Sequence, residues 1–105
     1  MHLVSYLQDG TLTIVLSGEI DHHCAKQYIQ TITSKVEAYK PQICVLDFQE
    51  VTFMDSSGIA VVINTLRNVA KIDGKLELVG LNQQPLKVLR ASGIEKIVNI
   101  KEEAK

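Results

Sequence analysis

The feature that most constrains this chain is a short polar turn at residues 53–58, Phe-Met-Asp-Ser-Ser-Gly, which joins two apolar segments of different periodicity. Residues 43–48 before it are almost wholly apolar and rich in β-branched side chains, which is typical of a buried strand. After the turn, apolar residues recur at helical spacing, which predicts an amphipathic helix over about residues 57–72. These apolar residues are Ile59, Val62, Ile63, Leu66, Val69 and Ala70. A turn of this kind is typical of an α/β fold, in which strands alternate with helices.

A hairpin and another helix are predicted ahead of this unit. The Asp-Gly pair at 9–10 is a strong hairpin signal, and it separates candidate strands at residues 3–7 and 11–17. We expect Gly18 to end the second strand and residues 19–24 to form a loop. An amphipathic helix should follow this loop, ending at the Lys-Pro pair at 40–41.

Two strands and a short helix complete the predicted order. A strand is expected at residues 75–80, a helix from Pro85 to about residue 92, and a last strand at 96–100. The order strand-strand-helix-strand-helix-strand-helix-strand predicts an α/β fold. Its sheet should be mixed but mainly parallel, with an antiparallel N-terminal hairpin at one edge and helices packed on it. We expect the strand at 43–48 to be buried on both faces, and residues 1–105 to form a single domain.

Composition excludes several classes of function. The formal net charge is −1, so the chain lacks the basic field with which proteins bind nucleic acid. No apolar run approaches the roughly 20 residues that span a bilayer, and the first residues do not resemble a signal peptide. Cys24 and Cys44 are far apart in sequence and form no C-x-x-C pair, which favours reduced structural thiols. These features predict a cytoplasmic protein without membrane insertion.

The predicted topology brings two polar segments together. Functional residues of such sheets gather at the carboxyl ends of the strands, where both the loop at Asp21 and the turn at 55–57 fall. The start of a helix offers unpaired backbone N–H groups and a positive dipole, which suit a phosphate or a binding partner. The structural alternative is that Asp55 or Ser56 simply caps the helix and its neighbours fill the turn.

Enzymatic and metal-binding alternatives have weaker support. A hydrolase elbow needs Gly-x-Ser-x-Gly, which the turn lacks, and only His2, His22 and His23 could activate a serine. Adjacent histidines point in different directions on most backbones, so the Asp-His-His-Cys segment at 21–24 predicts no metal site. The chain also lacks both glycine-rich phosphate-binding motifs. We therefore expect no enzyme activity, no metal and no cofactor.

Two segments carry a family resemblance. Residues 17–23, Ser-Gly-Glu-Ile-Asp-His-His, and residues 51–61 around the Asp-Ser-Ser-Gly turn resemble the STAS family. The Asp-His-His sequence is closer to its sporulation branch, the antagonists of the anti-sigma-F factor. The segment at 91–97 also fits, so the resemblance covers nearly the whole chain. It implies a small sheet with helices packed on it, in agreement with the predicted order of elements.

The resemblance implies a phosphorylation switch. In its unphosphorylated form such an antagonist binds an anti-sigma factor that is also an ATP-using serine kinase, and this binding frees sigma-F. The kinase then phosphorylates the first serine of the turn, here Ser56, and a membrane-linked serine phosphatase removes the phosphate. Ser57 would support the acceptor, and Asp55 and Gly58 would shape the interface. Asp21 and His22 would belong to the adjoining contact loop.

Three alternatives remain open from the sequence. The first is a STAS regulator of a different stress-response or phosphorelay circuit, with another kinase. The second is a STAS module that binds a nucleotide or lipid ligand beside the same turn. The third is a minimal serine hydrolase that uses Ser56 or Ser57.

Overall fold

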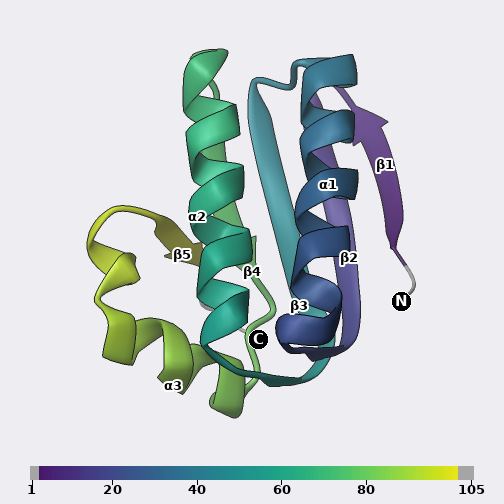
Figure 1. Cartoon of the computed structure of the whole chain (residues 1–105). Helices are drawn as coiled ribbons and strands as arrows, with labels where there is room; N and C mark the ends of the chain where they lie inside the picture. The colour runs from purple at the N-terminus through teal and green to yellow at the C-terminus, as the bar shows by residue number, and fades with distance from the viewer. Residues whose placement is uncertain (1–2, 102–105) are drawn as a thin grey trace.

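The computed structural model describes residues 3–101 as an alternation of strands and helices (Figure 1). In chain order the elements are β1 (Val4–Gln8), β2 (Thr11–Ile20), α1 (His22–Tyr39), β3 (Ile43–Met54), α2 (Ser56–Lys71), β4 (Lys75–Val79), α3 (Gln83–Ser92), the 3-10 turn η1 (Ile94–Lys96) and β5 (Asn99–Lys101). The predicted order of strands and α-helices is confirmed. No helix in this part of the chain is long and apolar enough to cross a membrane.

The five strands form one mixed sheet whose spatial order, β1-β2-β3-β4-β5, follows the order of the chain. β1 pairs with β2 in antiparallel fashion, and all other neighbours are parallel, as predicted. Each parallel connection steps one strand further in the same direction. Because such crossovers are right-handed, successive helices fall on the same face of the sheet. Figure 1 shows α1 and α2 side by side on that face, with α3 beside the first turns of α2.

The hydrophobic core lies between this face and the helices. In the first six residues of β2 and of β3, every second residue is completely buried and points toward the helices. These residues are Leu12, Ile14, Leu16, Cys44, Leu46 and Phe48, and α1 and α2 contribute Tyr28, Ile32, Val36, Val62 and Val69. Burial raises the pKa of the Cys44 thiol to about 12, so it stays protonated.

The expectation that residues 43–48 are buried on both faces was wrong. Ile43, Val45 and Asp47 alternate with the buried residues of β3 and are only half-buried. The apolar composition of the strand resembles that of a strand covered on both sides, but all the crossovers run in one direction. The helices therefore cover one face of β3 and leave the other open.

Two strands run further than predicted. β2 continues through Gly18, which adopts a positive φ of 76°, and ends at Ile20 instead of at residue 17. β3 continues past Phe48 to Met54, with two register shifts against β2. These shifts break the alternation of buried and exposed side chains, and this removed the strand signal from the sequence. The polar turn is consequently shorter than expected, and Asp55 alone separates β3 from α2.

The ends of the other elements also differ from the prediction. β1 is shifted by one residue to Val4–Gln8, and α2 begins at Ser56 and ends at Lys71. α3 begins two residues before Pro85, which therefore lies in its first turn. The predicted strand at 96–100 is wrong in its first half, because Ile94–Lys96 forms the 3-10 turn and β5 covers only Asn99–Lys101.

Candidate functional site at two adjacent helix N-termini

The register of the central strands brings the two polar segments together. Ile20, the last residue of β2, is the parallel partner of Met54, the last residue of β3. The next residue of each strand, Asp21 or Asp55, is the N-cap of the following helix. The backbone N–H of Asp55 donates to the carbonyl of Ile20 at 3.2 Å, which fixes the two junctions side by side. The sequence had predicted this proximity.

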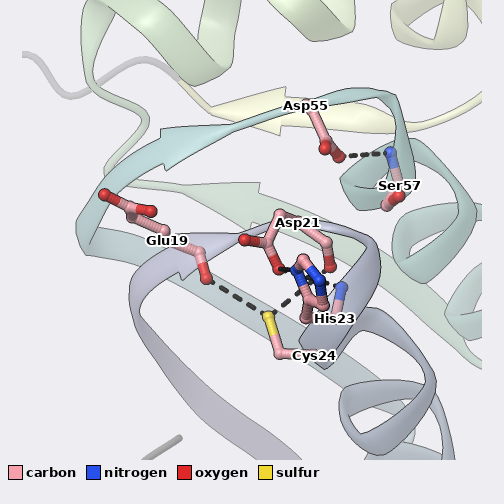
Figure 2. A network of polar contacts seen from close by, with 6 residues as sticks. All are labelled: Glu19, Asp21, His23, Cys24, Asp55 and Ser57. Atoms are coloured by element: carbon pink, nitrogen blue, oxygen red, sulfur yellow. Dashed lines mark hydrogen bonds and ion pairs between the residues drawn. The ribbon is translucent and has the colours of Figure 1, made fainter.

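Asp55 caps α2 with both its side chain and its backbone, and Figure 2 shows the side-chain bond to Ser57. Its Oδ1 accepts a hydrogen bond from the Ser57 backbone N–H at 2.8 Å, and its carbonyl accepts one from Gly58 at 3.0 Å. The structural role considered for this residue is therefore confirmed. Ser56 is the first residue of the helix and is exposed, whereas Ser57 is half-buried. Of the two hydroxyls, that of Ser56 is the more accessible to another protein.

Gly58 allows α2 to start directly above the end of β3. It is buried, and a Cβ atom at this position would overlap Cγ and Sδ of Met54, whose side chain is completely buried. Gly58 does not have a positive φ, so backbone conformation does not require a glycine here. The close packing against Met54 does require it. The start of α2 therefore combines an accessible hydroxyl on Ser56 with a tight contact at Gly58.

The segment predicted as a loop at 19–24 is divided between the end of β2 and the first turn of α1, with only Asp21 between them. Asp21 caps α1 by accepting a hydrogen bond from the His23 backbone N–H at 3.0 Å, so His22, His23 and Cys24 occupy its first turn. Because Asp21 is an efficient cap, the helix begins earlier than the apolar stripe indicates. The Cys24 thiol donates to the carbonyl of Glu19 at 3.2 Å and ties this turn to β2 (Figure 2).

The charge at this end of the molecule is mainly carboxylate. Glu19 is exposed, and Asp21 and Asp55 are half-buried caps at positive helix ends. Partial desolvation raises the pKa of Asp21, but the hydrogen bond and charge of His23 outweigh it and hold the pKa below its ordinary value. The imidazole Nδ1 of His23 lies 3.7 Å from Asp21 Oδ1. Asp21 is therefore a carboxylate at neutral pH.

The two histidines do not build a metal site with their surroundings. The rings of His22 and His23 are tilted by 36° with centroids 4.0 Å apart, and both side chains are exposed. Within residues 3–101 no group of three or more His, Cys, Asp or Glu side chains is arranged to hold a metal ion. The site therefore offers capped helix ends, an exposed hydroxyl and carboxylates, which suit regulated binding.

Sequence reasoning missed two side chains that bind the backbone of β3 before the turn. Asn82 and Gln84, at the start of α3, donate or accept hydrogen bonds at the free side of β3. Their partners lie about 30 residues away in the chain, so no local sequence pattern could predict these hydrogen bonds. Phe53 belongs to the same sequence segment as the turn, and no pattern in the sequence indicated that it is exposed. It lies in β3 with 42% of its surface exposed, two residues before the cap.

Comparison with known proteins gives consistent results. The profile of the STAS domain matches residues 2–105. The anti-sigma F factor antagonist of Paenibacillus polymyxa is 29% identical over 91 residues, which cover 87% of this chain and 78% of that protein. The anti-sigma-B factor antagonist of Bacillus subtilis is 27% identical over 93 residues, covering 88% and 83%.

Solved structures show the same fold. The anti-sigma factor antagonist SpoIIAA in its unphosphorylated form superposes with a TM-score of 0.84 at 24% identity, over 99% of this chain and 90% of that one. The phosphorylated form of the Bacillus cell fate determinant SpoIIAA gives a TM-score of 0.75 at 24% identity, over 99% and 93%. With the profile match over nearly all residues, these similarities establish that the chain belongs to the STAS domain family.

Proposed function

We propose that this protein is an anti-sigma factor antagonist of the sporulation type. Its unphosphorylated form binds an anti-sigma factor that is also a serine kinase, and this binding frees the sporulation factor sigma-F. Phosphorylation of Ser56 ends the interaction, and a serine phosphatase restores it. The observation that carries the proposal is the exposed Ser56 at the first position of α2, one residue after a cap that lies beside the cap of α1. Relatives named as antagonists of anti-sigma F support this assignment.

The geometry explains how a phosphate would act without unfolding the domain. Phosphorylation adds about −1.5 to −2 charges at neutral pH. At the N-terminus of α2 this charge meets the positive helix dipole, an interaction worth about 0.3–1 kcal/mol, so the fold is expected to persist.

Binding responds differently to the added charge. The partner must already accommodate the carboxylates of Asp55 and Asp21, and a buried phosphate would have to lose its water. A mismatch of only 1.4 kcal/mol lowers affinity tenfold. The modification therefore switches the interface while leaving the fold in place.

A second candidate is the same mechanism in a stress-response circuit. Relatives from Listeria monocytogenes and Bacillus subtilis are named anti-sigma-B factor antagonists, at 26% and 27% identity. These values are close to the 29% of the anti-sigma F relatives. The two candidates share the site and differ in the kinase that binds it, so binding to each kinase separates them.

The decisive experiment mixes the purified protein with ATP and each anti-sigma kinase encoded in the same genome. Intact mass and peptide mapping locate the phosphate, and gel filtration follows the complex. We expect one phosphate on Ser56, loss of the complex after phosphorylation, and restoration by the phosphatase. Ser56→Ala should bind but accept no phosphate, and Ser56→Asp should bind at least tenfold more weakly.

Ser57→Ala is the matched control, because it removes the neighbouring hydroxyl and keeps the backbone N–H that Asp55 binds. It should still be phosphorylated. Phosphate on Ser57 in the Ser56→Ala protein would move the acceptor by one residue. Tight binding without any phosphate would keep the antagonist and remove the covalent switch. Absence of both with every kinase would contradict the proposed function.

A further inference from the structure

The last part of β3 lacks a strand on one side. β4 pairs with β3 only from Ile43 to Asp47, whereas β3 continues to Met54. Side-chain amides from the start of α3 take the place of the missing strand. Asn82 Nδ2 donates to the carbonyls of Gln49 at 3.2 Å and Val51 at 3.0 Å.

Gln84 binds both main-chain groups of a single residue. Its Oε1 accepts from the Met54 N–H at 2.8 Å, and its Nε2 donates to the Met54 carbonyl at 2.9 Å. In an antiparallel sheet, the residue opposite Met54 in a hydrogen-bonded pair would make the same two bonds. A primary amide carries the donor and acceptor side by side that this arrangement needs, whereas an ionised carboxylate has acceptors only.

Met54 connects this amide to the phosphoacceptor turn. It immediately precedes the cap Asp55, and its side chain packs against Gly58 in the first turn of α2. On the other side, the N–H of Asp55 is held by the carbonyl of Ile20 in β2. The turn is therefore fixed from two directions, by β2 and by Gln84.

We propose that Gln84 is a positioning residue for Ser56. Its two hydrogen bonds hold Met54, and through Met54 they set the place of the first turn of α2 that the kinase meets. This inference rests on the proposed function, in which Ser56 is the phosphoacceptor. Gln84 is half-buried, and both of its bonds go to main-chain atoms of Met54. It therefore acts through the backbone of β3.

The test compares Gln84→Ala and Gln84→Glu with Asn82→Ala. Gln84→Ala removes both bonds to Met54, and Gln84→Glu keeps an acceptor for the N–H but places a carboxylate oxygen against the carbonyl. Asn82→Ala is the matched control, because it removes two hydrogen bonds from the same edge of β3, further from the turn. Kinase assays at saturating ATP give kcat and KM for Ser56, and hydrogen exchange follows the Met54 amide.

Both Gln84 variants should lower kcat for phosphorylation of Ser56 at least tenfold and accelerate exchange of the Met54 amide at least tenfold. Asn82→Ala should leave kcat within twofold of the unaltered protein. All assays are run well below the melting temperature of each variant, so that loss of folded protein does not enter the comparison. A fall in kcat with Gln84 but not with Asn82 is the signature of positioning.

Two results would overturn the inference. If the unaltered protein is phosphorylated on Ser56 and the Gln84 variants match it, or match Asn82→Ala at equal loss of stability, then Gln84 is only structural. In that case the proposed function stands. If no anti-sigma kinase binds or phosphorylates the unaltered protein, the proposed function fails and the positioning role fails with it.

Discussion

At the scale of single residues, Phe53 has the properties of an anchor for a partner. The other large hydrophobic side chains that are exposed in the described part of the chain belong to β1, the end of α1 or the segment after η1. Phe53 alone lies next to the Asp55 cap and Ser56. Aromatic side chains that become buried on binding often carry much of the energy of an interface.

We therefore expect Phe53→Ala to weaken binding of the anti-sigma kinase at least tenfold, or about 1.4 kcal/mol. The free energy of unfolding should fall by only about 1–2 kcal/mol, because the side chain is already 42% exposed. Isothermal titration calorimetry measures the affinity. Tyr39→Ala is the control, since Tyr39 is 51% exposed at the opposite end of α1 and should not affect binding. Equal affinities for both variants would place the interface elsewhere.

The residue-scale predictions from the sequence succeeded where chemistry is local. Asp55 and Ser56 were both candidate caps because of their type and their position before an apolar periodic segment, and the structure shows that Asp55 is the cap, through its bond to Ser57. His22 was placed in a loop because the apolar stripe of α1 begins only at Ala25. The role of Gln84 could not be predicted, because its partner Met54 is 30 residues away and glutamine is common on helix surfaces.

At the scale of elements, the contact between α2 and the end of β3 determines where the phosphoacceptor turn lies. We expect Gly58→Ala to destabilise the protein by about 1 kcal/mol. Alanine favours a helix over glycine by about 1 kcal/mol, but overlap with the buried Met54 side chain costs about 1–3 kcal/mol. Urea unfolding measures the difference.

A double-mutant cycle identifies the cause. Met54→Ala alone should be destabilising because it leaves a cavity, but Gly58→Ala added to it should no longer be harmful and should recover helix propensity. The coupling energy between the two sites should therefore favour the double variant. A gain in stability from Gly58→Ala in the unaltered background would show that Met54 moves aside at little cost.

Element boundaries were harder to predict than elements, and β3 shows why. Its first half was recognised because it is almost wholly apolar, whereas the second half carries exposed Gln49, Glu50 and Thr52. This half pairs with β2 across two register shifts and is completed by side-chain amides. Neither feature leaves a period of two in the sequence, so residues 49–54 could not be recognised as strand.

At the scale of the whole molecule, the order of elements predicted the α/β fold but not the open face of the sheet. Apolar composition alone suggested burial on both faces of β3. The missing information was the spatial order of the strands, which steps in one direction from β1 to β5. With right-handed crossovers this order places the helices on a single face.

The one-sided arrangement makes a direct prediction for two valines of the same strand. Val51 is completely buried, whereas Val45 lies on the open face and is half-buried. Val51→Ala should lower the free energy of unfolding by about 2 kcal/mol, from two buried methyl groups at about 0.8 kcal/mol each and a cavity term. Val45→Ala should cost less than about 1 kcal/mol, since most of its effect is reduced strand propensity.

Because both variants make the same substitution in β3, urea unfolding with a common m-value isolates the effect of the face. Equal losses would mean that the second face of the sheet is as well covered as the first, which the one-directional strand order excludes for residues 3–101 taken alone. Atoms from outside residues 3–101 would then have to cover the open face of the sheet. If the effect of Val45→Ala depends on protein concentration, a second copy of the chain covers the open face, because association stabilises the folded state by mass action.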